Sequence, residues 1–94
     1  MQLNKINDAL TVSPQIAIDD IPTLKEAGFR SIICNRPDGE GADQPTHEEI
    51  EAAAKVAGLE MRYLPVQTGL VQDEDAVAFG AALRNLPGPV LAYC

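Results

Sequence analysis

The sequence predicts a single α/β domain with three layers, in which helices flank a mostly parallel four-stranded sheet. Segments typical of strands alternate with segments typical of helices three times, and a fourth apolar strand closes the sequence. A length of 94 residues allows one small domain, residues 1–94. Apolar residues make up 46% and charged residues 22%, which is typical of a chain that folds around a core.

The first strand is predicted at residues 10–13, where apolar and hydroxyl side chains alternate. A helix follows, since Asp19 and Asp20 can cap its first turn and Gly28 can end it. The second strand is predicted at residues 29–34, which are mostly apolar and therefore expected to be buried.

The second helix has the clearest start. Thr46 and Glu49 have the spacing of a capping box, and Gly58 is suited to end the helix. The third strand is predicted within residues 59–66. Residues 35–41 between the second strand and this helix are rich in turn-forming residues, and we predict a loop there.

The third helix is predicted from Asp73 to Leu86, and the last strand covers residues 90–94. That strand is a continuous apolar run, which is typical of a strand buried on both faces. A loop and a covering helix normally follow such a strand, and a terminal carboxylate there would be costly. We therefore expect a C-terminally truncated domain whose final loop and helix are missing.

Charge and composition argue against several classes of function. Fourteen acidic and seven basic residues give a net charge of −7, which disfavours binding to nucleic acid. No apolar run approaches the roughly 18 residues of a membrane span, and the first residues do not resemble a secretory signal. We therefore expect a cytoplasmic protein with reduced cysteines. One histidine and two cysteines at these spacings do not make a zinc site, and no nucleotide-binding loop occurs, so we expect neither metal nor cofactor.

Candidate site residues lie where the predicted strands end, because sites in open α/β sheets form beyond the carboxyl ends of the strands. Residues 35–44, residues 67–72 and whatever follows Cys94 meet at this edge. If a loop and a helix followed Cys94, their N–H groups would lower the pKa of the thiol and make it a nucleophile. The alternative is that Cys94 is a small buried apolar residue.

Three further residues lie near this edge, and two of them, Arg36 and Cys34, have two interpretations each. Arg36 could bind an anion or form an ion pair with Asp38 or Glu40. Cys34 is expected in the core, and a resolving thiol near Cys94 is the alternative. His47 lies in the first turn of a helix and is expected to be exposed.

Several phrases of the sequence resemble the bacterial beta-lactamase-hydrolase-like family, which has a protein-tyrosine-phosphatase-like fold. Asn-Arg-Pro-Asp-Gly-Glu and Gly-Pro-Val-Leu-Ala-Tyr-Cys are the most specific phrases. The matching segments are residues 7–16, 33–40, 44–45, 57–59, 63–66 and 86–94. The resemblance implies a dual-specificity-phosphatase-like α/β fold, and some relatives are classed as sulfurtransferase-like.

The resemblance also implies a mechanism for Cys94. In such proteins the cysteine opens a Cys-x5-Arg phosphate-binding loop, and its thiolate attacks phosphorus to form a phosphocysteine. An aspartate protonates the leaving oxygen, usually from the loop after the preceding strand. That loop begins at Val66 without a carboxylate at the nearest place, so Asp38, Asp73 and Asp75 are alternative general acids. Asp38 can equally be a turn residue, and the other two can be ordinary acids of a helix N-terminus.

Three functions follow as hypotheses. The first is a cysteine-dependent phosphatase that hydrolyses phosphotyrosine or small phosphomonoesters. The second is a sulfurtransferase or persulfide carrier that uses the same cysteine. The partner in these two cases is a phosphorylated or persulfidic small molecule or protein. The third is a binding module or inactive fragment, for which an uncovered sheet face predicts self-association.

Overall fold

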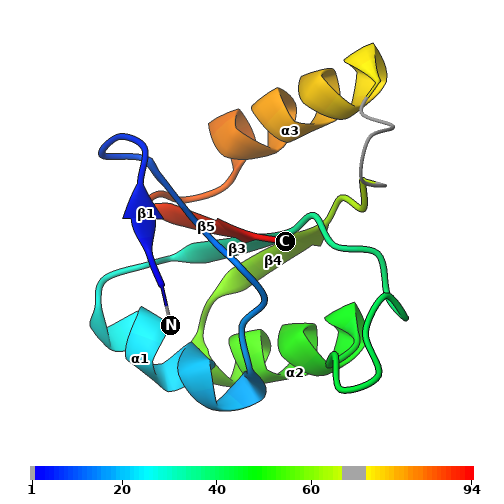
Figure 1. Ribbon diagram of the computed structural model, residues 1–94. Coiled ribbons are helices and arrows are strands. Elements are labelled where there is room, and N and C mark those ends of the chain that lie inside the picture. The colour runs from blue at the N-terminus through cyan, green and yellow to red at the C-terminus, as the bar shows by residue number, and fades with distance from the viewer. Residues whose placement is uncertain (1, 67–71) are drawn as a thin grey trace.

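The computed structural model describes residues 2–66 and 72–94. In these ranges the chain forms one sheet, with strand order β1-β2-β5-β3-β4 (Figure 1). The strands are β1 (Asn4–Lys5), β2 (Leu10–Ser13), β3 (Ser31–Cys34), β4 (Glu60–Tyr63) and β5 (Val90–Tyr93).

The last strand, β5, lies in the middle of the sheet. It pairs in parallel with β2 on one side and β3 on the other, and Ala92 is aligned with both Val12 and Ile33. All four residues of β5 are buried, as the apolar run predicts. The carboxyl ends of β2, β5, β3 and β4 therefore share one edge of the sheet.

The predicted number of four strands is wrong by one, because β1 pairs with β2 in the antiparallel direction. Both residues of β1 are exposed and neither is apolar, so no hydrophobic pattern marks the strand. The other strands lie within the predicted ranges, and the mostly parallel character of the sheet is confirmed.

Helices cover both faces of the sheet and confirm the three layers. The short 3-10 turn η1 (Ile18–Asp20), α1 (Ile21–Glu26) and α2 (His47–Ala57) lie on one face, and α3 (Asp73–Asn85) lies on the other (Figure 1). Side chains alternate across the sheet, so Ile32 and Leu91 join the core under α1 and α2, whereas Ile33 joins the core under α3.

The helix ends follow the sequence signals with one exception. At α2 the Thr46 hydroxyl accepts the Glu49 N–H at 3.2 Å, and Gly58 ends the helix with a φ of 82°. The sequence had suggested that the Asp20 side chain caps α1, but it forms no such hydrogen bond. Its carboxylate accepts the Ala17 N–H at 2.8 Å, which stabilises the 3-10 turn before the helix.

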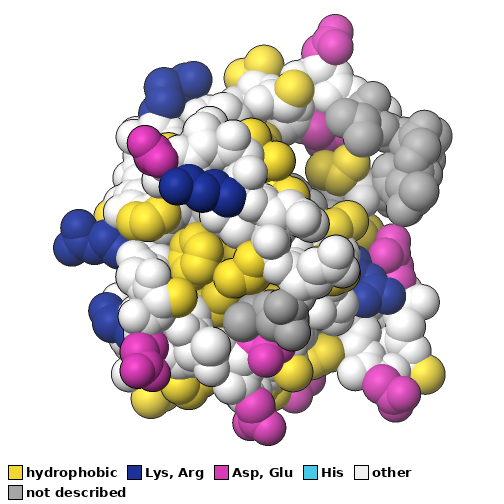
Figure 2. Space-filling model, turned by 60° about the vertical axis from the view of Figure 1, so that its left-hand side comes forward, with side chains coloured by type: hydrophobic (Ala, Val, Ile, Leu, Met, Phe, Trp, Pro, Cys, Tyr) yellow, Lys and Arg dark blue, Asp and Glu magenta, His cyan; other side chains and the backbone are white. Residues whose placement is uncertain are grey.

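The α3 face is the more loosely covered of the two. No residue of α3 is buried, and Leu10 and Val12 of β2 are only partly buried beneath it. From the side of β1, apolar side chains are visible at the surface among charged ones (Figure 2). No helix in the described ranges is both long and apolar enough to cross a bilayer.

Candidate functional site

Cys94 lies at the carboxyl edge of the sheet, directly after β5. Its N–H donates to the Ser13 carbonyl of β2 at 3.1 Å, and the Asn35 N–H donates to the Tyr93 carbonyl at 2.9 Å. Tyr93 is buried, whereas Cys94 is exposed. The edge of the central strand therefore presents a free thiol, flanked by the segments that follow β2 and β3.

The segment that follows β3, residues 35–46, is called the rim loop here. Within it the Arg36 Nε lies 3.2 Å from the Glu40 carboxylate, and Nη1 donates to the Gln15 Oε1 at 3.2 Å. Of the two predicted ion-pair partners, the structure selects Glu40. The Arg36 side chain is 24% exposed, so its charge is largely committed to holding the loop.

Asp38 contacts His47 through both of its carboxylate oxygens. Oδ1 accepts the backbone N–H of His47 at 2.8 Å, and Oδ2 lies 2.6 Å from the ring Nδ1. Partial desolvation raises the pKa of Asp38, but the hydrogen bonds and charge of His47 outweigh it and hold the pKa below its usual range. Asp38 is therefore ionised at neutral pH.

His47 is half-buried, with 24% of its side chain exposed, and the expectation of an exposed histidine is wrong. Its ring stacks on Tyr63 with centroids 3.7 Å apart and planes 1° apart. The Tyr63 hydroxyl in turn accepts the Asp38 N–H at 3.1 Å. This Asp38–His47–Tyr63 cluster joins the rim loop, α2 and β4, and sequence reasoning missed it because its members are distant in sequence.

Asp73 and Asp75 lie in the first turn of α3. Asp73 is exposed, whereas Asp75 is half-buried and its Oδ2 accepts the Gln72 N–H at 2.9 Å. Asp75 also lines a small hollow of about 190 Å³ with Tyr63 and the residues that follow β4. Residues 67–71, where a loop was predicted, lie outside the described residues.

The structure does not bring the three candidate acids together. No hydrogen bond or ion pair joins Asp73 or Asp75 to Asp38 within residues 2–66 and 72–94. The same ranges hold no group of three or more side chains that could bind a metal ion. The described part of the edge therefore offers a thiol, a paired arginine and separate carboxylates.

Cys34 is a core residue. It is 1% exposed, its Sγ donates to the Arg36 carbonyl at 3.3 Å, and burial raises the pKa of its thiol. The Tyr93 hydroxyl lies in the same core and has no hydrogen-bond partner among the described residues. The two cysteines thus have opposite environments, and Cys94 is the accessible one.

Solved structures share the fold of this chain. A candidate phosphatase from Neisseria meningitidis superposes with a TM-score of 0.90 and is 34% identical, over 97% of this chain and 65% of that chain. TpbA from P. aeruginosa, solved as a cysteine-to-serine variant in complex with pTyr, shares the fold with a TM-score of 0.67 at 19% identity, over 97% of this chain and 51% of that chain. The class of protein is therefore an α/β domain with the protein-tyrosine-phosphatase-like fold.

Within this class of protein, the chain can be assigned to one family. The model of the phosphatase-like domain of beta-lactamase hydrolase-like proteins matches residues 2–94, and the chain belongs to this family. A beta-lactamase hydrolase-like protein of Agrobacterium fabrum (strain C58) is 38% identical over 94 residues, which are 100% of this chain and 22% of that protein. The chain thus spans about a fifth of the length of the curated relative.

Proposed function

We propose that this domain is a cysteine-dependent phosphatase that hydrolyses phosphotyrosine or small phosphomonoesters. The single observation that carries the proposal is the exposed Cys94 at the carboxyl end of the buried central strand. Membership in a phosphatase-like family and the likeness to a candidate phosphatase support it. The pTyr bound to TpbA, which shares the fold, motivates phosphotyrosine as the first substrate to test.

The proposed reaction has two steps. The Cys94 thiolate attacks phosphorus and forms an S–P bond as the P–O bond to the leaving group breaks, and a general acid protonates the leaving oxygen. A water molecule then attacks phosphorus and returns a proton to the deprotonated general acid, the S–P bond breaks, and phosphate and the thiolate are released. The charge that develops on the phosphoryl oxygens needs N–H or cationic donors for stabilisation.

Asp75 is the candidate we favour as the general acid. Both carboxylate oxygens of Asp38 already contact His47, at 2.8 Å and 2.6 Å, so neither is free to face a leaving group. Asp75 lines the hollow at the carboxyl end of β4, whereas Asp73 is exposed at the helix start. In this proposal Asp38 supports the rim loop, and Arg36 helps to bind the substrate anion if it exchanges Glu40 for phosphate.

Phosphatase activity is tested with p-nitrophenyl phosphate and phosphotyrosine, in the protein as its natural gene encodes it. We expect Cys94→Ser to reduce turnover to background, and Cys34→Ala, the matched change at the buried thiol, to retain it. Acid-quenched wild-type protein is expected to carry one phosphoryl group on the peptide that contains Cys94. Full activity in Cys94→Ser would contradict the proposal.

The choice of Asp75 as the general acid is tested by comparing two variants. Asp75→Asn is expected to slow hydrolysis of substrates with poor leaving groups far more than hydrolysis of p-nitrophenyl phosphate, because a good leaving group needs no proton. Asp73→Asn is the matched control, because Asp73 lies two residues away in the same first turn of α3 and is exposed. An equal effect of the two variants would remove Asp75 from this role.

A persulfide carrier is the second candidate function, and one observation favours it. Arg36, the cation of the described rim, is already paired with Glu40, and a sulfane sulfur needs less positive charge than a phosphoryl group does. The Cys94 thiolate would attack the sulfane sulfur of thiosulfate, form an S–S bond and release sulfite. Mass spectrometry is expected to find one added sulfur atom on Cys94 and none on Cys94→Ser.

Both reactions need Cys94 as a thiol, so the proposal places the protein in a reducing compartment such as the cytoplasm. If neither a phosphoryl group nor a sulfur atom is transferred to Cys94, the domain acts as a binding module instead.

A further inference from the structure

The outer surface of α1 and α2 contains an apolar groove with a volume of about 610 Å³, formed by elements other than the strand that leads to Cys94. Its apolar lining is formed by Ile18, Ile21, Pro22, Ala53, Val56 and Ala57.

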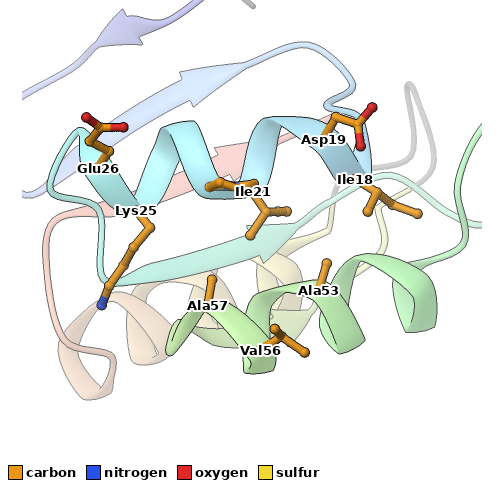
Figure 3. Close-up of a pocket in the computed structure, with 9 residues that line it drawn as sticks. Ile18, Asp19, Ile21, Lys25, Glu26, Ala53, Val56 and Ala57 are labelled. Atoms are coloured by element: carbon orange, nitrogen blue, oxygen red, sulfur yellow. The ribbon is translucent and has the colours of Figure 1, made fainter.

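Two large apolar side chains on this groove are open to solvent. Val56 is 91% exposed and Ile18 is 39% exposed. Val56 projects outward from α2 and away from α1, whereas Ala53 and Ala57 point toward α1 (Figure 3). Because Val56 and Ile18 are exposed, the groove is open to solvent. An open apolar groove suits a helix that lies along it better than a small molecule, which needs an enclosed pocket.

Three charged residues line the groove, and two of them, Asp19 and Glu26, are acidic. Asp19 and Glu26 lie at opposite ends of the η1–α1 segment (Figure 3), and neither forms an ion pair within the described ranges. The Lys25 ammonium lies near Gly58, at the C-terminus of α2, where the partial negative charge of the helix end offsets it. Two carboxylates thus remain available along the α1 side.

From the apolar floor and these two carboxylates we infer that the groove binds a basic amphipathic helix of a partner protein. Asp19 and Glu26 are seven positions apart, and two helical turns span about 10 Å. A partner helix with an apolar stripe and two Lys or Arg residues seven positions apart would match both features. A second copy of this chain is disfavoured, because it carries the same carboxylates and a net charge of −7.

The test uses fluorescence anisotropy with this chain and a labelled synthetic helical peptide of roughly 15 residues. The peptide carries a leucine stripe and two lysines seven positions apart on one side of it. A scrambled peptide of the same composition tests the need for the stripe, and a peptide with glutamates in place of the two lysines tests the charge. We expect at least tenfold tighter binding of the first peptide than of either control.

Protein variants locate the binding. Val56→Glu is expected to weaken binding at least tenfold, whereas Val77→Glu, at a valine of α3 that is 68% exposed, should change it less than twofold. Asp19→Asn with Glu26→Gln should remove the preference for lysine over glutamate. Because Val56 is exposed, its replacement is compatible with folding, and circular dichroism checks this.

Three outcomes would overturn the inference. The first is equal binding of the ordered and scrambled peptides, and the second is an equal loss in the Val56 and Val77 variants. The third is a dimer in light scattering that Val56→Glu converts to a monomer, which would show that a second copy covers the groove.

Discussion

The ring Nδ1 of His47 lies 2.6 Å from the Oδ2 of Asp38, and this contact fastens the rim loop to the first turn of α2. The backbone N–H of His47 binds the other carboxylate oxygen at 2.8 Å. Asp38 therefore acts as a bridge between the loop after β3 and a helix N-terminus, where negative charge is favourable.

The first prediction concerns acid stability. Because the folded-state pKa of Asp38 lies below its unfolded value, the unfolded chain binds the proton more readily. The stabilisation is therefore present above the unfolded pKa of about 3.9 and is lost as the pH falls through the folded pKa. Asp38→Asn should lower the melting temperature at pH 7 by about 2–4 °C. It should also reduce the loss of stability as the pH falls.

Asp8→Asn is the matched control, because the Lys5–Asp8 pair is largely exposed, with 67% and 102% of the two side chains accessible. It should leave the melting temperature almost unchanged. Equal effects of the two variants would show that the Asp38 contact adds no stability.

The second prediction separates the two roles of Tyr63. Tyr63→Phe removes the acceptor of the Asp38 N–H but keeps the stack on His47, whereas Tyr63→Leu removes both. We expect losses of about 1 kcal/mol for the first variant and about 2 kcal/mol for the second in urea unfolding. Proton NMR should show shielded His47 ring resonances in wild type and Tyr63→Phe only.

The third prediction concerns the buried hydroxyl of Tyr93. Burial raises the pKa of Tyr93, so its phenol should stay protonated in alkaline solution until the protein unfolds. Because the unfolded chain loses this proton first, stability should fall as the pH rises above about 10. Ultraviolet difference spectra follow the ionisation.

Since the Tyr93 hydroxyl lacks a hydrogen-bond partner in the described residues, Tyr93→Phe should be neutral or stabilising in urea unfolding. A loss of more than about 1 kcal/mol would indicate a hydrogen bond to this hydroxyl.

The fourth prediction compares the two thiols. Iodoacetamide should modify Cys94 in the folded protein and leave Cys34 unmodified, because Cys34 is 1% exposed and burial raises its pKa. Both should react in urea. Peptide mapping after a timed reaction gives the two rates, and rapid modification of Cys34 in the folded state would contradict the core assignment.

Much of the fold follows from local signals in the sequence. The Thr46–Glu49 capping box and Gly58 mark α2, and the apolar run at 90–93 marks a strand buried on both faces. These features depend on neighbours in sequence, which a periodic pattern records. The exposed strand β1 was missed because its two residues depend on pairing with β2 rather than on burial.

The site was less predictable because its contacts are long-range. The position of Cys94 at the sheet edge follows from strand order, but the 9-residue separation of Asp38 and His47 and the 25-residue separation of Asp38 and Tyr63 have no local signature. Arg36 could be assigned an ion pair, yet the choice of Glu40 and the contact with Gln15 depend on how the loop folds back.

The central position of β5 also has a consequence for biosynthesis. This strand fills the space between β2 and β3, yet of the five strands that the structure describes it leaves the ribosome last. Until then β2 and β3 have no shared neighbour, and the nascent chain exposes the strand surfaces that β5 later covers. We therefore expect folding to begin only after residue 93 has emerged, and chaperones that bind exposed apolar strands to associate with the chain before that point.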